Sequence, residues 1–122
     1  MGPVIVDSSV WAKHLRRPSL MLRNLLRDRR VLTHPLVTAE LMLGRLDDRW
    51  ELLDAMRALP RAPVAEPDAV LALIETEFLY ERKIGYVDAN LLASARLRPG
   101  VMLWSEDVEL IKLAEYFGVA AE

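Results

Sequence analysis

Four acidic residues stand where the sequence predicts contact with a hydrophobic core: Asp7, Glu40, Asp88 and Asp107. Asp7 directly follows the apolar run at residues 4–6, which is typical of a strand buried on both faces of a parallel sheet. Each of the other three lies on the apolar stripe of a predicted helix, where residues three, four and seven positions apart face the same side. The stripes comprise Val37, Glu40, Leu41 and Gly44; Asp88, Leu91, Leu92 and Ala95; and Asp107, Leu110, Ile111 and Ala114.

Such acids need a compensating charge, because burying an isolated carboxylate costs at least several kcal/mol. The stripes contain no obvious core-facing Lys or Arg. A divalent cation is therefore the economical partner, and Mg²⁺ or Mn²⁺ prefers oxygen ligands of this kind. One or two carboxylate-held ions are a common device for phosphoryl chemistry, where they activate a water and stabilise charge on the leaving oxygen.

Each acid also has an ordinary structural explanation when it is taken singly. Asp88 and Asp107 could be helix N-caps, since Asp is favoured there, and Asp7 could cap the helix that follows it. Glu40 could pair with a local arginine. The sequence alone does not show whether the four side chains converge.

The segments that must position these acids alternate between short apolar strands and helices. We expect strands at residues 4–6, 31–34 and 101–104, a last one at 119–121, and a short edge strand within 59–64. We expect helices from 8 or 9 to about 14, from 20, from 36 to 46, from 47 or 48 to 58, from 67 to 83 with Gly85 as its C-terminal cap, from 87 to 97, and from 107 to 117. This alternation predicts an α/β fold with a central parallel sheet flanked by helices, as one domain over residues 1–122.

The bulk composition is that of an ordinary globular protein. Of the 122 residues, 52% are hydrophobic and 28% are charged, and there is no cysteine, which excludes disulfides and thiolate metal sites. No apolar run approaches membrane-spanning length, and no signal peptide is evident, so we expect a cytoplasmic protein. Residues 1–30 carry seven basic and two acidic side chains on a chain of net charge −2. That asymmetry indicates a local basic patch for a polyanion or a solvated arginine-rich helix face.

At four places the sequence resembles, in order and spacing, the acidic motifs of PIN-domain nucleases. The motifs are Val6-Asp7-Ser8-Ser9-Val10; Thr38-Ala39-Glu40-Leu41 with Gly44; Tyr86-Val87-Asp88-Ala89-Asn90-Leu91-Leu92-Ala93; and Ser105-Glu106-Asp107 with Val108-Glu109-Leu110. The resemblance covers essentially the whole chain. Within the family, its length and the closing helix followed by Gly118-Val119 are most similar to the VapC toxins of VapBC toxin–antitoxin modules.

The resemblance implies a PIN-like fold with an acidic pocket at the strand ends, and a metal-dependent endoribonuclease acting on single-stranded or looped RNA. It places Asp7, Glu40, Asp88 and Asp107 at the catalytic, metal-holding positions, with Mg²⁺ or Mn²⁺ as cofactor. Ser105 matches a hydroxyl position and Ser9 a small polar position, both expected to orient a ligand or water. Glu109 falls where many relatives have a further Asp. The implied partners are a VapB-like antitoxin and a second copy of the chain in a homodimer.

Three other readings of the chain remain. A receiver-type signalling domain also has a parallel sheet and an acidic Mg²⁺ pocket, but it needs an acidic pair after the first strand and a Lys after a late one. A dinucleotide-binding fold lacks its glycine fingerprint here. A non-catalytic PIN-like module that only binds RNA leaves the four acids unexplained. His14 and His34 fall in no metal-ligand spacing. Several aromatic residues could stack on bases, although tryptophan on helices and at strand ends is more often part of a core or dimer interface: Trp11, Trp50, Trp104, Tyr80 and Tyr86.

Overall fold

A three-stranded parallel sheet forms the centre of the computed structural model, which describes residues 2–121. The strands are β1 (Val4–Val6), β2 (Val31–Leu32) and β3 (Met102–Trp104), in the order β2-β1-β3. Ile5 pairs with Leu32 on one side and with Leu103 on the other. All three residues of β1 are at most 1% exposed, as expected for the middle strand of a sheet covered on both faces.

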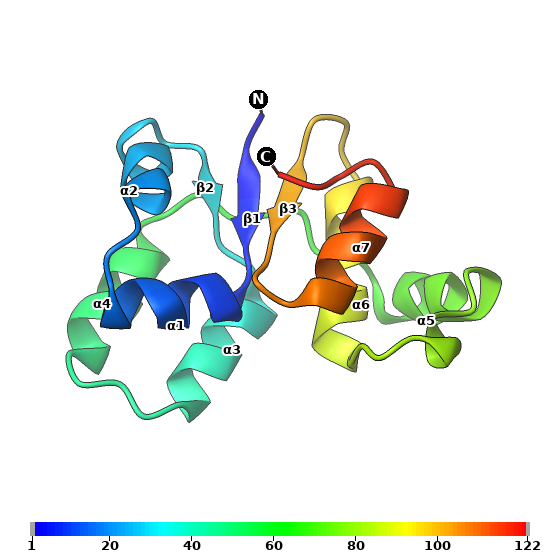
Figure 1. Ribbon diagram of the computed structural model, residues 1–122, viewed down its shortest axis with the longest axis horizontal. Coiled ribbons are helices and arrows are strands. Elements are labelled where there is room, and N and C mark those ends of the chain that lie inside the picture. The colour runs from blue at the N-terminus through cyan, green and yellow to red at the C-terminus, as the bar shows by residue number, and fades with distance from the viewer. Residues whose placement is uncertain (1, 122) are drawn as a thin grey trace.

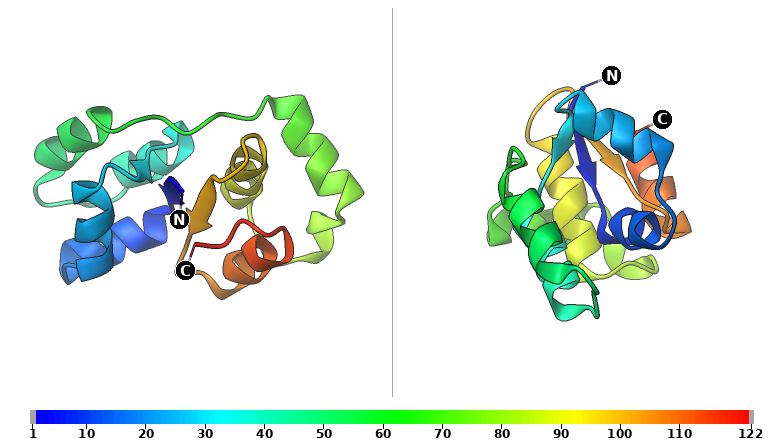
Figure 2. Two further views of the ribbon diagram at one scale, coloured as in Figure 1. Left: turned by 90° about the horizontal axis from the view of Figure 1, so that it is seen from above. Right: turned by 90° about the vertical axis from the view of Figure 1, so that its left-hand side faces the viewer.

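Helices cover both faces of this sheet (Figure 1). They are α1 (Ser8–Arg16), α2 (Leu20–Arg27), α3 (Pro35–Leu43), α4 (Arg49–Arg57), α5 (Pro67–Thr76), α6 (Tyr86–Arg96) and α7 (Val108–Tyr116), with a short 3-10 helix η1 (Leu79–Glu81). Figure 2 shows α1, α2 and α7 on one face, and α3, α4 and α6 on the other. The α/β architecture with a parallel sheet and flanking helices is confirmed.

The carboxyl ends of the strands share one edge of the sheet, because the strands are parallel. Helices α1 and α7 begin at that edge, directly after β1 and β3, and the amino end of α6 lies there too (Figure 1). Parallel α/β sheets bind ligands at this edge. The fold thus brings the first turns of three helices together around the end of β1.

Several predicted boundaries differ from the structure. The helix predicted over residues 67–83 ends at Thr76, because Phe78 adopts a left-handed conformation with φ of 54° that breaks the helical path. Gly85 is not the C-terminal cap of that helix but the N-cap of α6, in an extended conformation. The last expected strand and the edge strand are each reduced to a single bridge, Leu103–Ala120 and Thr33–Arg61.

The second strand also stops earlier than predicted. His34 N-caps α3, its Nδ1 accepting a hydrogen bond from the backbone N–H of Leu36 at 3.1 Å, so the strand ends before residue 34. Helix α3 likewise ends at Leu43 rather than at residue 46. No helix among residues 2–121 combines the length and apolar character that crossing a membrane requires.

Candidate active site

Asp7 lies at the centre of the site and is held by three donors. Its side chain is only 5% exposed. Oδ1 accepts from the backbone N–H of Ser8 at 2.8 Å, which caps α1, and Oδ2 accepts from the hydroxyls of Ser9 and Ser105, each at 2.8 Å. Asp7 is therefore both a helix cap and a buried, precisely oriented carboxylate.

Ser105 connects Asp7 to the start of α7. Its hydroxyl, which donates to Asp7, also accepts from the backbone N–H of Asp107 at 3.0 Å. The Asp107 side chain in turn accepts from the backbone N–H groups of Glu109 at 2.9 Å and Leu110 at 3.4 Å as the N-cap of α7. The short connection between β3 and α7 thus fixes Asp107 relative to Asp7 through one hydroxyl group.

Asp88, in the first turn of α6, is half-buried and lies within electrostatic reach of two other acids. Its Oδ2 accepts from the backbone N–H of Gly85 at 3.0 Å. Burial raises the pKa of the Asp88 carboxyl, and the charges of Asp7 and Asp107 raise it further, against the lowering effect of the Gly85 N–H. The raised pKa therefore reflects burial first and the nearby negative charges second.

Glu40 approaches the same group from α3 through Ser8. Its Oε1 accepts from the Ser8 hydroxyl at 2.8 Å, and Ser8 is the residue next to Asp7. This role of Ser8 was not predicted from the sequence. The only signal was a hydroxyl residue directly after Asp7, which by itself indicates a helix start.

The expectation that all four acids face the hydrophobic core is correct only for Asp7. Glu40 and Asp107 are exposed, and Asp88 is half-buried. Val37 and Leu41, which share the predicted stripe with Glu40, are 0% and 4% exposed. An apolar helix stripe is wide enough for a residue at its margin to reach solvent at the end of the sheet.

Protein cations do not neutralise the four carboxylates. Among residues 2–121, none of the ion pairs involves Asp7, Glu40, Asp88 or Asp107. Glu109 instead pairs with Arg82 at 3.5 Å and Lys112 at 3.9 Å. The negative charge that raises the pKa of Asp88 therefore has no ion-pair partner in this part of the chain.

The four acidic side chains do not form a compact cluster of the kind that coordinates a metal ion. Within the described residues, no group of three or more His, Asp or Glu side chains is close enough together to hold a metal ion. Each carboxylate is turned to a neighbouring donor: a serine hydroxyl for Asp7 and Glu40, a backbone N–H for Asp88 and Asp107. The structure links Asp7 to the backbone N–H of Asp107 through the Ser105 hydroxyl, and it links Ser8 directly to Glu40.

Both histidines make structural hydrogen bonds. His34 is fully buried, with Nδ1 capping α3 and Nε2 at 2.9 Å from the Ser94 hydroxyl of α6. His14 accepts from the backbone N–H of Ser19 at 2.9 Å and so closes the turn between α1 and α2. Trp11 is buried in the core, whereas Trp50, Tyr80 and Tyr86 are exposed.

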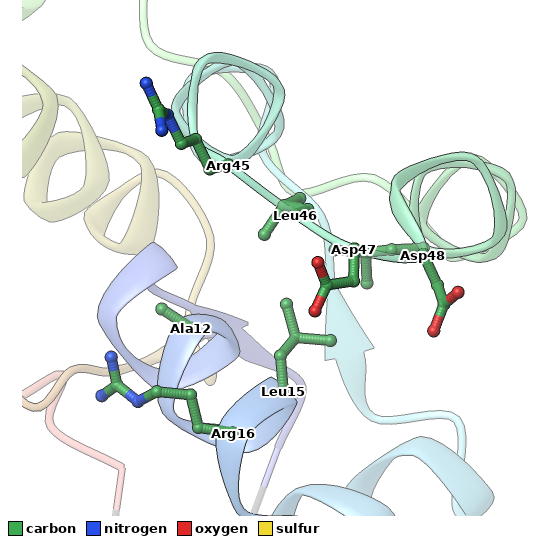
Figure 3. A pocket seen from close by; sticks show the side chains of 8 residues that line it. Ala12, Leu15, Arg16, Arg45, Leu46, Asp47 and Asp48 are labelled. Carbon is green, nitrogen blue, oxygen red and sulfur yellow. The ribbon is translucent and has the colours of Figure 1, made fainter.

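A surface cavity lies away from the four acids. A cavity of about 310 Å³ opens between α1 and the connection from α3 to α4, lined by Ala12, Leu15, Arg16, Arg45, Leu46, Asp47, Asp48 and Leu52. Figure 3 shows Leu15 of α1 facing Leu46 and Asp47 across it. None of the four acids lines this cavity.

Comparisons with known proteins agree over almost the full length. Residues 4–116 match the family described as PIN domain. Ribonuclease VapC32 of Mycobacterium tuberculosis, from strains CDC 1551 / Oshkosh and ATCC 25618 / H37Rv, is 42% identical over 117 residues, covering 96% of this chain and 94% of the relative. The crystal structure of PAE2754 from Pyrobaculum aerophilum shares the fold, with a TM-score of 0.63 at 19% identity over 96% of this chain and 90% of that one.

Proposed function

Because the chain belongs to the PIN-domain family, we propose that it is a metal-dependent endoribonuclease, the VapC-type toxin of a type II toxin–antitoxin system. It would hydrolyse phosphodiester bonds of RNA as a single PIN-like domain over residues 1–122. The observation that carries the proposal is the linked set of acids at the end of β1, on a chain that is similar over its whole length to a protein named as a ribonuclease.

The chemistry of the donor set fits Mg²⁺ or Mn²⁺. The available ligands are carboxylate and hydroxyl oxygens, which these ions prefer. Asp7, Glu40, Asp88 and Asp107 would hold the metal, and the repulsion that raises the pKa of Asp88 is what a cation relieves. When bound, such an ion supplies a Lewis acid that activates water and neutralises charge at the phosphate.

The serines orient the carboxylates for this task. Ser9 and Ser105 donate hydrogen bonds to Oδ2 of Asp7, and Ser8, the next residue in the chain, donates to Glu40. Because Asp7 is already held by three donors, little of its side-chain entropy is lost when a ligand binds. Lys or Arg residues from the basic first quarter of the chain would hold the flanking phosphates, which makes RNA binding fall steeply with salt.

The similarity to VapC32 also supports a place in a toxin–antitoxin module. We expect a VapB-like antitoxin that covers the acidic edge, a homodimer as the working assembly, and cytoplasmic action on RNA. A small open reading frame directly upstream of the gene would support this arrangement.

Cleavage of RNA tests the proposal. The partner-free protein is incubated with a pool of structured and unstructured RNAs in Mg²⁺ or Mn²⁺, with and without chelator, alongside the Asp88→Asn variant. We expect cleavage only for the wild type with metal. Cleavage that persists in both chelator and variant contradicts the mechanism, and RNA binding without any cleavage would favour the non-catalytic module.

A further inference from the structure

A second cavity adjoins the acidic site on the side of α1. It has a volume of about 210 Å³ and lies between α1 and the connection from β3 to α7. Val10, Lys13 and His14, which share one face of α1, line it together with Arg17, the extended residue that ends the helix. Trp104 and Glu106 form the opposite wall.

Hydrogen bonds join this cavity directly to Asp7. The Ser9 hydroxyl accepts from the backbone N–H of Glu106 at 3.0 Å and donates to Asp7 Oδ2 at 2.8 Å. Ser105, which separates Trp104 from Glu106 in the sequence, donates to the same oxygen. A ligand in the cavity would therefore lie immediately beside the carboxylates.

The walls present hydrogen-bond donors, positive charge and an aromatic ring. Lys13 Nζ is held by Glu106 Oε1 at 2.8 Å, which fixes the ammonium at the cavity. Arg17 is exposed, and among residues 2–121 it pairs with no carboxylate. His14 accepts through Nδ1, so its neutral ring carries the proton on Nε2 as a donor. Trp104 adds a partly exposed indole.

We propose that this cavity is a nucleotide subsite, in which Arg17 and Lys13 bind the phosphate next to the scissile one and Trp104 stacks on the base. The inference rests on the proposed ribonuclease function and adds positioning residues to it. A strand of RNA is repelled by four carboxylates, so a cationic site connected to Asp7 through Glu106 and Ser9 provides the attraction that brings it to them. Base stacking on an aromatic ring is tolerant of sequence.

Binding of RNA without cleavage tests the subsite. A fluorescein-labelled, random-sequence single-stranded oligoribonucleotide is titrated by anisotropy with full-length protein carrying Asp88→Asn, over a range of salt concentrations. Adding Arg17→Ala should raise Kd several-fold and lower the slope of log K against log salt by about 0.7, the effect of one lost phosphate contact on a single strand. Trp104→Ala should raise Kd roughly tenfold, and Trp104→Phe should retain most of the affinity.

Arg98→Ala is the matched control, because it removes the same charge from an exposed position in the connection before β3, at the other edge of the sheet. The proposal is overturned if Arg17→Ala and Arg98→Ala have the same Kd and salt slope. It is also overturned if Arg17→Ala changes only the oligomeric state or the binding of a protein partner.

Cleavage kinetics separate this inference from the proposed function. In protein that keeps Asp88, Arg17→Ala should raise KM and leave kcat within a factor of about two. The reason is that the Arg17 contact stabilises the bound substrate and the transition state equally. If the wild type cleaves RNA but Arg17→Ala and Arg98→Ala have equal KM, the subsite proposal is wrong and the ribonuclease proposal stands. If the wild type binds RNA through Arg17 but never cleaves it, the ribonuclease proposal is wrong and the subsite proposal stands.

Discussion

At the scale of single residues, the four acids differ in how firmly they are held. Asp7 is buried and receives three hydrogen bonds, whereas Glu40 and Asp107 are exposed and Asp88 is half-buried. Asp7 is thus the most firmly held of the four acids, and the other three lie at the margins of their helices. The Ser105 hydroxyl joins Asp7 to the backbone N–H of Asp107, and the Ser8 hydroxyl donates to Glu40.

Removing the Ser105 hydroxyl should impair the site without unfolding the protein. Ser105→Ala deletes the donor to Asp7 Oδ2 and the acceptor for the N–H of Asp107. We expect a loss of activity of about 10- to 100-fold, typical for residues that orient metal ligands, with retained secondary structure by circular dichroism. Ser105→Thr keeps the hydroxyl and should preserve most of the activity. Equal activity of the alanine variant and the wild type would contradict the role of this hydroxyl.

Neutralising Asp88 should stabilise the fold while it abolishes cleavage. The raised pKa means that the folded state holds the Asp88 proton more tightly than the unfolded chain, so the ionised carboxylate destabilises the fold at neutral pH. Asp88→Asn removes that charge, and its amide oxygen can still accept from Gly85. We expect a higher Tm in chelator by differential scanning fluorimetry.

The response to metal provides the control for this variant. Mg²⁺ or Mn²⁺ should raise the Tm of the wild type, because a ligand that binds only the folded state stabilises it, and should have much less effect on Asp88→Asn. A variant less stable than the wild type in chelator would show that hydrogen bonding at Asp88 outweighs its electrostatic strain.

At the scale of elements, the sequence predicted the existence of the helices and the three strands better than their ends. The apolar run at residues 4–6 and the helix start at residue 20 depend on local sequence, and both predictions were correct. The predicted end of α5 was wrong because Phe78 adopts a left-handed conformation, and no glycine in the sequence indicates such a conformation there. Gly85 was misassigned because a glycine between two helices fits either cap.

In the site, too, features set by local sequence were predicted and features set by helix packing were not. The identity of the four acids and of Ser9 and Ser105 came from their place next to predicted elements and from the ordered motifs. The hydrogen bond from Ser8 to Glu40 joins residues 32 positions apart and depends on how α1 packs against α3, which no local pattern encodes. The exposure of Glu40 and Asp107 likewise depends on where each helix begins relative to the sheet edge.

His34 links α3 to α6 and should make stability depend on pH. Burial, with a smaller effect of Arg61, lowers the pKa of His34 from its ordinary value of 6.5. The unfolded chain therefore binds the proton more readily, so this contribution to stability is complete above pH 6.5 and is lost as the pH falls below it. Urea unfolding at a series of pH values should show this decline.

Two substitutions identify the histidine responsible. His34→Asn can still cap α3, and we expect it to be less stable at neutral pH but to show a weaker decline below pH 6.5. His14→Gln should remove a separate part of the decline, because the pKa of His14 is also lowered by burial and by Arg23. An unchanged decline in His34→Asn would contradict this assignment.

At the scale of the whole molecule, one edge of the sheet gathers opposite charges. The acids lie at the carboxyl end of β1, while the basic first quarter of the chain supplies α1 and α2 on one face of the sheet (Figure 2). Lys13 and Arg17 bring part of that positive charge to a cavity beside Asp7. An acidic centre for a cation and a basic flank for the polyanion are what metal-dependent cleavage of RNA requires.

The central claim is that Asp7, Glu40, Asp88 and Asp107 serve one cation-dependent centre. Anomalous diffraction from crystals of the protein grown with Mn²⁺ tests it most directly. The account predicts manganese at the end of β1 with Asp7 and at least two of the other three carboxylates turned toward it, and no manganese there in Asp7→Asn. Manganese bound elsewhere, in a protein that still cleaves RNA, would contradict it.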